Sequence, residues 1–280
     1  MAESFVEGLI NHLKLPAKQI YVSAPSTKNI ERFKSLGCHH SRRMIDIFGK
    51  YGCNVIILAC HGSAVKKCYA DGGSYPRALL TNYIPHVPYP LYILSLVSGV
   101  TLEEVKKTLF NPEGGASKYK HEMHRIMFNA AVGYGTGMIA VDCEPDGKHL
   151  APGLRQMFSA MGKLEYVPES QMDAACATGG SGLAYSYYFM SALADGGFKM
   201  GLSRQMAVKF AAKTADCAAR SVLESGKHPG ELQDSVCAPS GPAIYGVHVL
   251  DKADVKSGII AAVEASHKRA LELATTDMGN

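Results

Sequence analysis

Residues 203–226 read SRQMAVKFAAKTADCAARSVLESG, and this stretch decides the architecture of the second half of the chain. Ser203 can cap a helix in which Met206 and Phe210 follow helical spacing, and Gly226 stands where helices commonly end. Small apolar residues occupy more than one face of this helix, so it needs burial on several sides. The pattern predicts a helix inside a larger helical assembly.

Helical spacing continues almost throughout residues 181–274. Ala184 and Tyr188 share one face of the first helix, and Ile259 and Val263 share one face of the last. A single unit of this size can barely bury so many apolar helix faces, and packing against a second copy of the chain is the simplest way to bury them. We therefore expect an all-α dimerisation domain over residues 169–280.

The first half instead alternates between strand and helix patterns, which predicts a parallel sheet flanked by helices. The expected strands are 20–23, 55–59, 92–97 and 164–167. The expected helices are 2–13, one capped by Ser26 that runs through Ile30, Phe33 and Leu36, and 102–109 after a Thr101 cap. Such a fold normally opens with a strand, whereas this sequence opens with a helix. We expect an α/β Rossmann-like domain over residues 1–168.

Composition excludes several classes of function. The 280 residues are 47% hydrophobic with a net charge of +4, and the basic residues are scattered, so we expect no nucleic-acid partner. The apolar run 55–59 is too short to span a membrane. Glu3 and Glu7 argue against a transit peptide, and the eight cysteines contain no C-x-x-C pair. We expect a cytoplasmic protein with reduced thiols, no membrane partner and no metal.

Five short segments of the second half carry a more specific pattern: GSG at 180–182, ALADGG at 192–197, KMGL at 199–202, HPGEL at 228–232 and VEAS at 263–266. In this order and spacing they resemble the pyrroline-5-carboxylate reductases. The resemblance covers the whole chain, is most specific over 173–273, and rests in the first half on SGVT at 98–101 and on Met1-Ala2 with Gly8-Leu9. It implies reduction of 1-pyrroline-5-carboxylate to L-proline with NADP or NAD, by a homodimer or larger homo-oligomer.

The resemblance also implies a dinucleotide loop of the form G-x-G-N-M-A between the first strand and the first helix. The sequence begins at Met1-Ala2, the last two letters of that motif, without the strand and glycines before it. Either the sequence starts late or the protein lacks the loop, and we expect a late start, because a parallel sheet without its central strand should fold badly.

Other stretches match the family's cofactor positions. The segment after the strand 20–23 has hydroxyl side chains and no acid, which favours binding of NADP, or of NADP and NAD alike, over strict specificity for NAD. Ser26 would also be explained if it served only as a helix cap. His61 stands at the position of a family lysine, where it either keeps a hydrogen-bond donor or is only an exposed loop histidine. Asn129 matches the asparagine of a Met-Pro-Asn-x-Pro motif whose prolines are absent. The cofactor residues that the resemblance implies are Ser23, Ala24, Pro25, Ser26, Ala59, Cys60, His61, Ser98, Gly99 and Asn129.

The family's substrate loop reads Ser/Thr-Ser-Pro-Gly-Gly-Ala/Thr-Thr, and its last threonine reaches the ring nitrogen of the substrate. The substrate-binding residues implied for this chain are Val236, Cys237, Ala238, Pro239, Ser240, Gly241 and Ala243. Ala238 and Ala243 each replace a hydroxyl, and Pro242 removes an amide donor. Ser240 and Tyr245 are possible substitutes, so the catalytic residue stays open.

These substitutions leave three hypotheses. The first is a pyrroline-5-carboxylate reductase, slowed by the depleted loop. The second is a weakened or inactive paralogue that acts as a dimeric binding or scaffold protein, which fits the losses at the glycine loop and at Ala243. The third is an imine or keto-acid reductase with an altered substrate, which the Ser240-Gly241-Pro242 sequence would fit.

Overall fold

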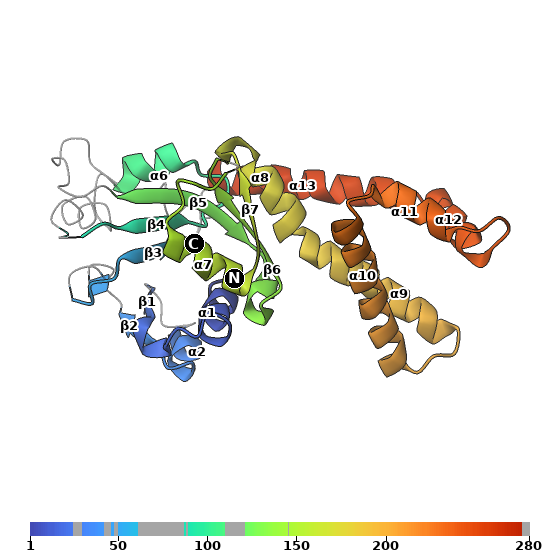
Figure 1. Ribbon diagram of the computed structural model, residues 1–280, viewed down its shortest axis with the longest axis horizontal. Helices are drawn as coiled ribbons and strands as arrows, with labels where there is room; N and C mark the ends of the chain where they lie inside the picture. The colour runs from blue at the N-terminus through green and yellow to red at the C-terminus, as the bar shows by residue number, and fades with distance from the viewer. Residues whose placement is uncertain are drawn as a thin grey trace. The chain divides into compact units, whose positions relative to one another are not determined.

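The computed structural model describes residues 1–24, 30–41, 46–47, 50–60, 87, 89–109, 121–144 and 146–275. The chain divides into two compact units, one of residues 1–180 with 266–280 and the other of residues 181–265 (Figure 1). Residues 169–180 therefore group with the first unit. The domain bounds expected from the sequence, 1–168 and 169–280, stay a prediction.

Five strands of the first unit form one sheet in the order β3-β4-β5-β6-β7: β3 (Val55–Leu58), β4 (Tyr92–Ser95), β5 (Glu122–Phe128), β6 (Gly137–Asp142) and β7 (Gly162–Val167). β3, β4 and β5 run parallel, with Ile56 opposite Ile93. β6 is antiparallel to β5 and parallel to β7. β1 (Tyr21–Ser23) and β2 (His39–Ser41) form a separate parallel pair.

The Rossmann-like class is confirmed, and the four predicted strands are present as β1, β3, β4 and β7. The sequence did not predict β2, β5 or β6, and the antiparallel pairing of β5 with β6 departs from the expected all-parallel sheet. β5 was not predicted because His124 and Arg125 interrupt its apolar pattern, although both residues are buried. A single sheet was also expected, whereas β1 and β3 do not pair among the described residues.

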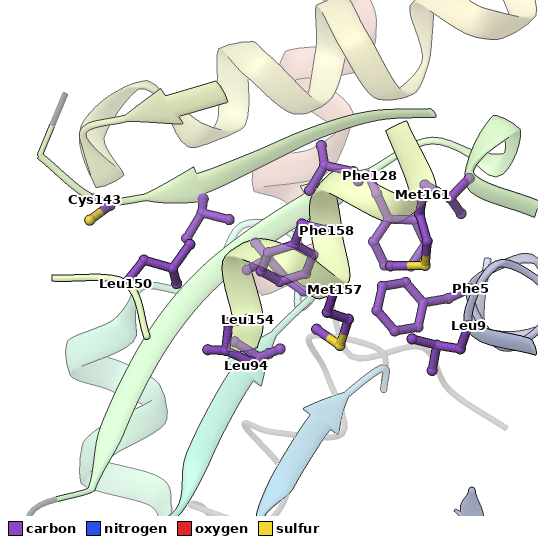
Figure 2. Packing of buried hydrophobic residues seen from close by; sticks show 14 residues of the cluster. Phe5, Leu9, Leu94, Phe128, Cys143, Leu150, Leu154, Met157, Phe158 and Met161 are labelled. Atoms are coloured by element: carbon purple, nitrogen blue, oxygen red, sulfur yellow. The ribbon is translucent and has the colours of Figure 1, made fainter. Parts of the chain in front are cut away.

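Helices cover both faces of the five-stranded sheet. α1 (Ala2–Asn11) and α7 (Pro152–Met161) cover one face, where Phe128 of β5 packs in the main core with Phe5 of α1 and Phe158 of α7 (Figure 2). The ring centroids of Phe5 and Phe128 lie 4.8 Å apart. Because neighbouring residues of a strand point to opposite faces, Met127 packs instead in a second cluster with Met172.

The remaining elements of this unit are short. They are η1 (Ala17–Gln19), α2 (Ile30–Ser35), α6 (Leu102–Leu109), η3 (Ala130–Tyr134), η4 (Glu169–Gln171), α8 (Met172–Ala175) and the π-helical turn η5 (Cys176–Gly180). The expected helices at 2–13 and 102–109 are present, and the described part of the helix expected through Ile30, Phe33 and Leu36 is α2. Gly37, with φ of 86°, follows α2 in the conformation that glycine favours. The expected Ser26 cap lies outside the described residues.

The second unit is helical, as predicted: α9 (Gly182–Lys199), α10 (Arg204–Ser225), α11 (Pro229–Val236) and α12 (Pro242–Lys252), with α13 (Val255–Thr275) continuing into the first unit. Ser203 caps α10 by accepting a hydrogen bond from the Met206 amide at 3.3 Å, and Gly226 ends it with φ of 67°. α9 and α10 pack through Ala194, Ala207 and Ala211. None of the described helices is both long and apolar enough to cross a membrane.

Candidate active site

Three of the predicted cofactor stretches meet at one edge of the five-stranded sheet. Ala59 and Cys60 follow β3, Ser98 and Gly99 lie in the turn after β4, and Asn129 follows β5. Because these strands are parallel, their carboxyl ends share an edge, and this is the edge at which open α/β sheets bind ligands. The structure therefore forms a candidate nucleotide edge from segments far apart in the sequence.

The other predicted cofactor residues are placed differently. Ser23 ends β1 and Ala24 follows it, in the two-stranded sheet, and both are half-buried. Pro25, Ser26 and His61 lie outside the described residues. Their assignment stays a prediction.

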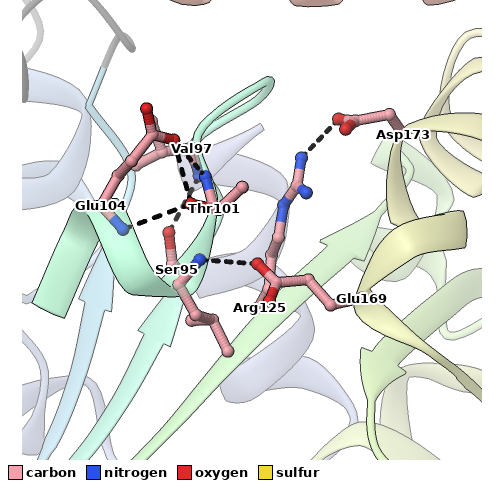
Figure 3. A network of polar contacts seen from close by, with 8 residues as sticks. Ser95, Val97, Thr101, Glu104, Arg125, Glu169 and Asp173 are labelled. Atoms are coloured by element: carbon pink, nitrogen blue, oxygen red, sulfur yellow. Dashed lines mark hydrogen bonds and ion pairs between the residues drawn. The ribbon is translucent and has the colours of Figure 1, made fainter.

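The turn between β4 and α6 is held by local hydrogen bonds (Figure 3). The Val97 amide donates to Ser95 Oγ at 3.4 Å. Thr101 and Glu104 form a capping box: the Glu104 amide donates to Thr101 Oγ1 at 3.2 Å, and the Thr101 amide donates to Glu104 Oε2 at 2.8 Å. Gly99 adopts φ of 70°, which few other residues tolerate, and Ser98 is exposed to contact a ligand.

The amino end of α6 is unsuited to phosphate. The Leu102 amide donates to Glu169 Oε1 at 2.6 Å, and Glu104 occupies the Thr101 amide. Glu103 adds a further carboxylate to the first turn. Three acids at one helix end repel an anion and occupy donors that it would need, so the turn fits a ribose or nicotinamide better than a pyrophosphate.

The amino end of α1 is the better fit for an anion. Met1 occupies the cap position without a side-chain hydrogen bond to the first turn. The one acid of that turn, Glu3, is paired with Arg32 at 2.6 Å, which offsets its charge. A helix amino end without a side-chain cap and with a compensated charge favours a phosphate group.

Asn129 uses its side chain within the protein. Its Oδ1 accepts hydrogen bonds from the Ala131 amide at 3.2 Å and the Met138 amide at 3.3 Å. Its Nδ2 donates to the Gly179 carbonyl at 2.9 Å. The side chain thereby joins the end of β5 to η3, to β6 and to the turn η5, and only 8% of the residue is exposed.

A buried polar cluster lies further back along β5. Arg125 donates from its guanidinium to Asp173 of α8, and its amide donates to Asp142 Oδ1 at 2.7 Å. Burial raises the pKa of the nearby Cys176 thiol to about 11, only partly offset by the charge of Arg125. Cys176 is therefore a neutral thiol and a poor nucleophile at neutral pH.

The predicted substrate loop connects α11 to α12 in the second unit. Residues 238–241 form a tight turn in which the Gly241 amide donates to the Ala238 carbonyl at 2.9 Å. Pro239 occupies the second position of this turn, and Ser240 occupies the third with φ of 57°, in the left-handed region that glycine favours. The family pattern has glycine at this position, and a serine adopts this backbone conformation only at some cost in strain.

The loop leads directly into the amino end of α12. Gly241 is the cap residue without a side-chain bond, and Pro242 takes the first helical position, where a missing N–H costs little. The amides of Ala243 and Ile244 are the next donors of this helix end. Ala243 and Ser240 are exposed, and Tyr245 is 67% exposed one turn into the helix.

Sequence reasoning missed the residues that hold these loops in place. The Thr101–Glu104 capping box was recognisable as T-x-x-E before a helix. Nothing in the pattern pointed to the partners of Glu169, Arg125 or Asp173, which the fold brings together from distant segments. Among the described residues, no cluster of three His, Cys, Asp or Glu side chains could hold a metal.

The fold and these sites define a class: a Rossmann-like sheet unit followed by a helical unit of the dimerisation type. Residues 169–273 match the family model of the pyrroline-5-carboxylate reductase dimerisation domain. Pyrroline-5-carboxylate reductase 3 of Bos taurus is 32% identical over 273 residues, covering 98% of this chain and 82% of the relative. The Danio rerio protein of the same name is 32% identical over 281 residues, covering 100% of this chain and 90% of the relative. The chain belongs to the pyrroline-5-carboxylate reductase family.

Solved structures agree at the level of the fold. The Plasmodium falciparum pyrroline carboxylate reductase with NADP bound is 20% identical and gives a TM-score of 0.75 over 97% of this chain and 93% of its own. The Coxiella burnetii pyrroline-5-carboxylate reductase is 26% identical and gives a TM-score of 0.69 over 98% and 95%.

Proposed function

We propose that this chain reduces 1-pyrroline-5-carboxylate to L-proline with NADPH or NADH. The observation that carries the proposal is a likeness to reductases along nearly the whole chain, at 32% identity over 98% of its length. The carboxyl edge of β3, β4 and β5 supports it, because this edge offers small and hydroxyl side chains where such a fold binds nucleotides.

The bound nicotinamide supplies the hydride, and the protein orients it and excludes water. Ala59, Cys60, Ser98 and Gly99 would line one side of the cofactor. The amino end of α1 would face the pyrophosphate, because it lacks a side-chain cap. Ser23 would contact the adenosine ribose or its 2′-phosphate, and the absence of an acid at Ser23 and Ala24 favours NADP.

The substrate carboxylate would bind at the amino end of α12. The amides of Ala243 and Ile244 and the hydroxyl of Ser240 offer donors there. Tyr245 or Ser240 would replace the family threonine as the donor to the ring nitrogen. Losing two hydrogen bonds to charged groups at roughly 1.5–3 kcal/mol each would slow the reaction, so we expect a slow reductase unless these hydroxyls compensate.

We also propose that the chain works as a homodimer or larger homo-oligomer. Large apolar side chains of the helical unit are exposed, among them Tyr188 at 81%, Leu223 at 80% and Val249 at 63%. Apolar faces of this extent call for a partner surface. Light scattering of the whole chain should give at least twice the monomer mass, and a monomer at micromolar concentration would contradict the assembly.

The activity is tested by NADPH consumption with racemic 1-pyrroline-5-carboxylate at neutral pH. L-Proline as the product would support the proposal. Turnover of other cyclic imines or keto acids, without turnover of this imine, would favour the altered-substrate reductase. A well-folded dimer that turns over none of these compounds would favour the non-catalytic paralogue.

A further inference from the structure

Three groups of residues 169–180 accept hydrogen bonds from the start of α6, from β5 and from the residue that follows β5. Glu169 Oε1 accepts from the Leu102 amide at 2.6 Å, just after the turn that contains Ser98 and Gly99. Asp173 accepts from the guanidinium of Arg125, and the Gly179 carbonyl accepts from Asn129 Nδ2 at 2.9 Å. We call residues 169–180 the anchor segment; Figure 3 shows the first two of its contacts.

The donors on and after β5 contact the anchor segment in the order in which they occur along the chain. Arg125 and Asn129 lie four residues apart on β5 and its end, and they bind Asp173 and Gly179 in the same order along the chain. The segment therefore follows β5 toward its carboxyl end. Side chains also place the segment against β5, because Met172 packs with Met127, and a Cβ added at Gly179 would lie 2.7 Å from Met127 Cε.

The bonds of Asn129 leave little room for a ligand contact. Its oxygen already accepts two amide hydrogens, and one of its two amide hydrogens goes to Gly179. The residue is 8% exposed, and Arg125 is 3% exposed. Buried polar groups used in this way fix backbone segments relative to one another.

We propose that Asn129 and Arg125 hold the anchor segment on the carboxyl edge of β4 and β5, and that Asn129 is a positioning residue instead of a cofactor contact. The Glu169 contact then ties the Ser98–Gly99 turn to the same segment. The hydride-transfer geometry at this edge depends on the anchor segment, and this kinetic consequence rests on the proposed function.

The first test is independent of activity. Asn129→Asp keeps the two acceptor bonds and removes the donor to Gly179, while Asp173→Asn weakens the other attachment and cannot alter a cofactor contact at Asn129. Hydrogen exchange measured by mass spectrometry in peptides covering residues 174–181 should accelerate by at least ~10-fold in both variants. Asn54→Asp, the same change at an exposed residue on the opposite edge, should leave these peptides unchanged. Unchanged exchange in Asp173→Asn, or in a folded Asn129→Asp, would overturn the proposal.

The second test is kinetic and uses the whole chain with NADPH and the imine. Both variants should lower kcat by a similar factor of about 10 while KM for NADPH changes less than about threefold, because misplacement by a fraction of an ångström slows transfer more than it weakens binding. A raised KM for NADPH in Asn129→Asp, with Asp173→Asn unaffected, would instead assign Asn129 a direct cofactor contact. If the unchanged protein shows no turnover, the proposed function fails. The hydrogen-exchange result still tests whether Asn129 and Arg125 hold the anchor segment in place.

Discussion

His124 Nδ1 lies 3.3 Å from Asp142 Oδ1, and the two residues connect adjacent antiparallel strands inside the sheet unit. Burial alone would lower the pKa of His124, but hydrogen bonds to Asp142 and the charges of Asp142 and Glu122 outweigh it and raise the pKa above its ordinary value. The protonated form is thus more stable in the folded protein than in the unfolded chain.

The first prediction is that this pair stabilises the fold most at low pH. Its contribution is complete below the unfolded pKa of about 6.5 and is lost as the pH rises through the higher folded pKa. His124→Gln should therefore lower the free energy of unfolding by ~1–3 kcal/mol near pH 6, and by less near pH 9. Urea unfolding at both pH values measures the difference.

The control for this prediction is His248→Gln, the same change at an exposed residue of α12, which should show no such trend. A difference between the His124 variant and the unchanged protein that stays constant, or grows with pH, would show that the charge of His124 does not stabilise the fold.

The second prediction concerns Ser240, whose φ of 57° lies in the left-handed region. Ser240→Gly removes the strain at some cost in chain entropy, so it should change stability by no more than about 0.5–1 kcal/mol, whereas the β-branched Ser240→Val should cost more than ~1 kcal/mol. Thermal or urea unfolding distinguishes the two. Equal stability of the glycine and valine variants would contradict the positive φ.

The same glycine variant reports on the hydroxyl of Ser240. If that hydroxyl replaces donors that the loop lacks, kcat/KM for 1-pyrroline-5-carboxylate should fall by roughly 5–10-fold in Ser240→Gly, a loss of about 1 to 1.4 kcal/mol. Unchanged kcat/KM would indicate that Tyr245 or a water molecule, and not Ser240, donates the hydrogen bond to the substrate.

The third prediction is a gain of activity. Ala243→Thr restores a hydroxyl that can bond the ring nitrogen while charge develops there, so it should raise kcat/KM by at least ~10-fold, or ~1.4 kcal/mol. Pro242→Ala should add to the gain, with coupling because the positions are adjacent. NADPH consumption measures both effects.

Ala253→Thr serves as the control, because Ala253 is exposed at the opposite end of α12. Two results would count against the role of position 243: an unchanged protein that is already as fast as an ordinary reductase, or a variant that binds NADPH and gains nothing.

The fourth prediction concerns the edges of β1 and β3, which do not pair with each other in the described part of the chain. β3 has the sequence VIIL, without the charges or proline that usually protect an edge strand. Adding an apolar strand and a Gly-x-Gly turn ahead of Met1 should join the two sheets and supply amides for the pyrophosphate, strengthening NADPH binding by at least ~10-fold. Calorimetry on both forms measures the change.

An extension of equal length with a scrambled, polar strand is the matched control for this experiment and should bind no better than the 280 residues alone. Low-micromolar NADPH affinity of the unextended chain would show that the cofactor does not need the added turn.

Local sequence patterns were sufficient to predict those elements whose signal lies within a few residues. Helical spacing and caps at Ser203 and Gly226 predicted α10, and Thr101 predicted the start of α6. β5 was missed, because its buried polar residues His124 and Arg125 are paired with Asp142 and Asp173 from elsewhere in the chain. Short-range patterns carry no information about such long-range partners.

The amino-acid sequence alone was enough to establish the family, the order of a sheet unit and a helical unit, and the loss of polar groups in the loop 236–243. The tertiary structure was needed to show that the side chain of Asn129 donates to the Gly179 carbonyl and that the distant Glu169 accepts from the amino end of α6. The reason is physical: residue identities fix which donors and acceptors exist, but burial and strand pairing decide which of them meet.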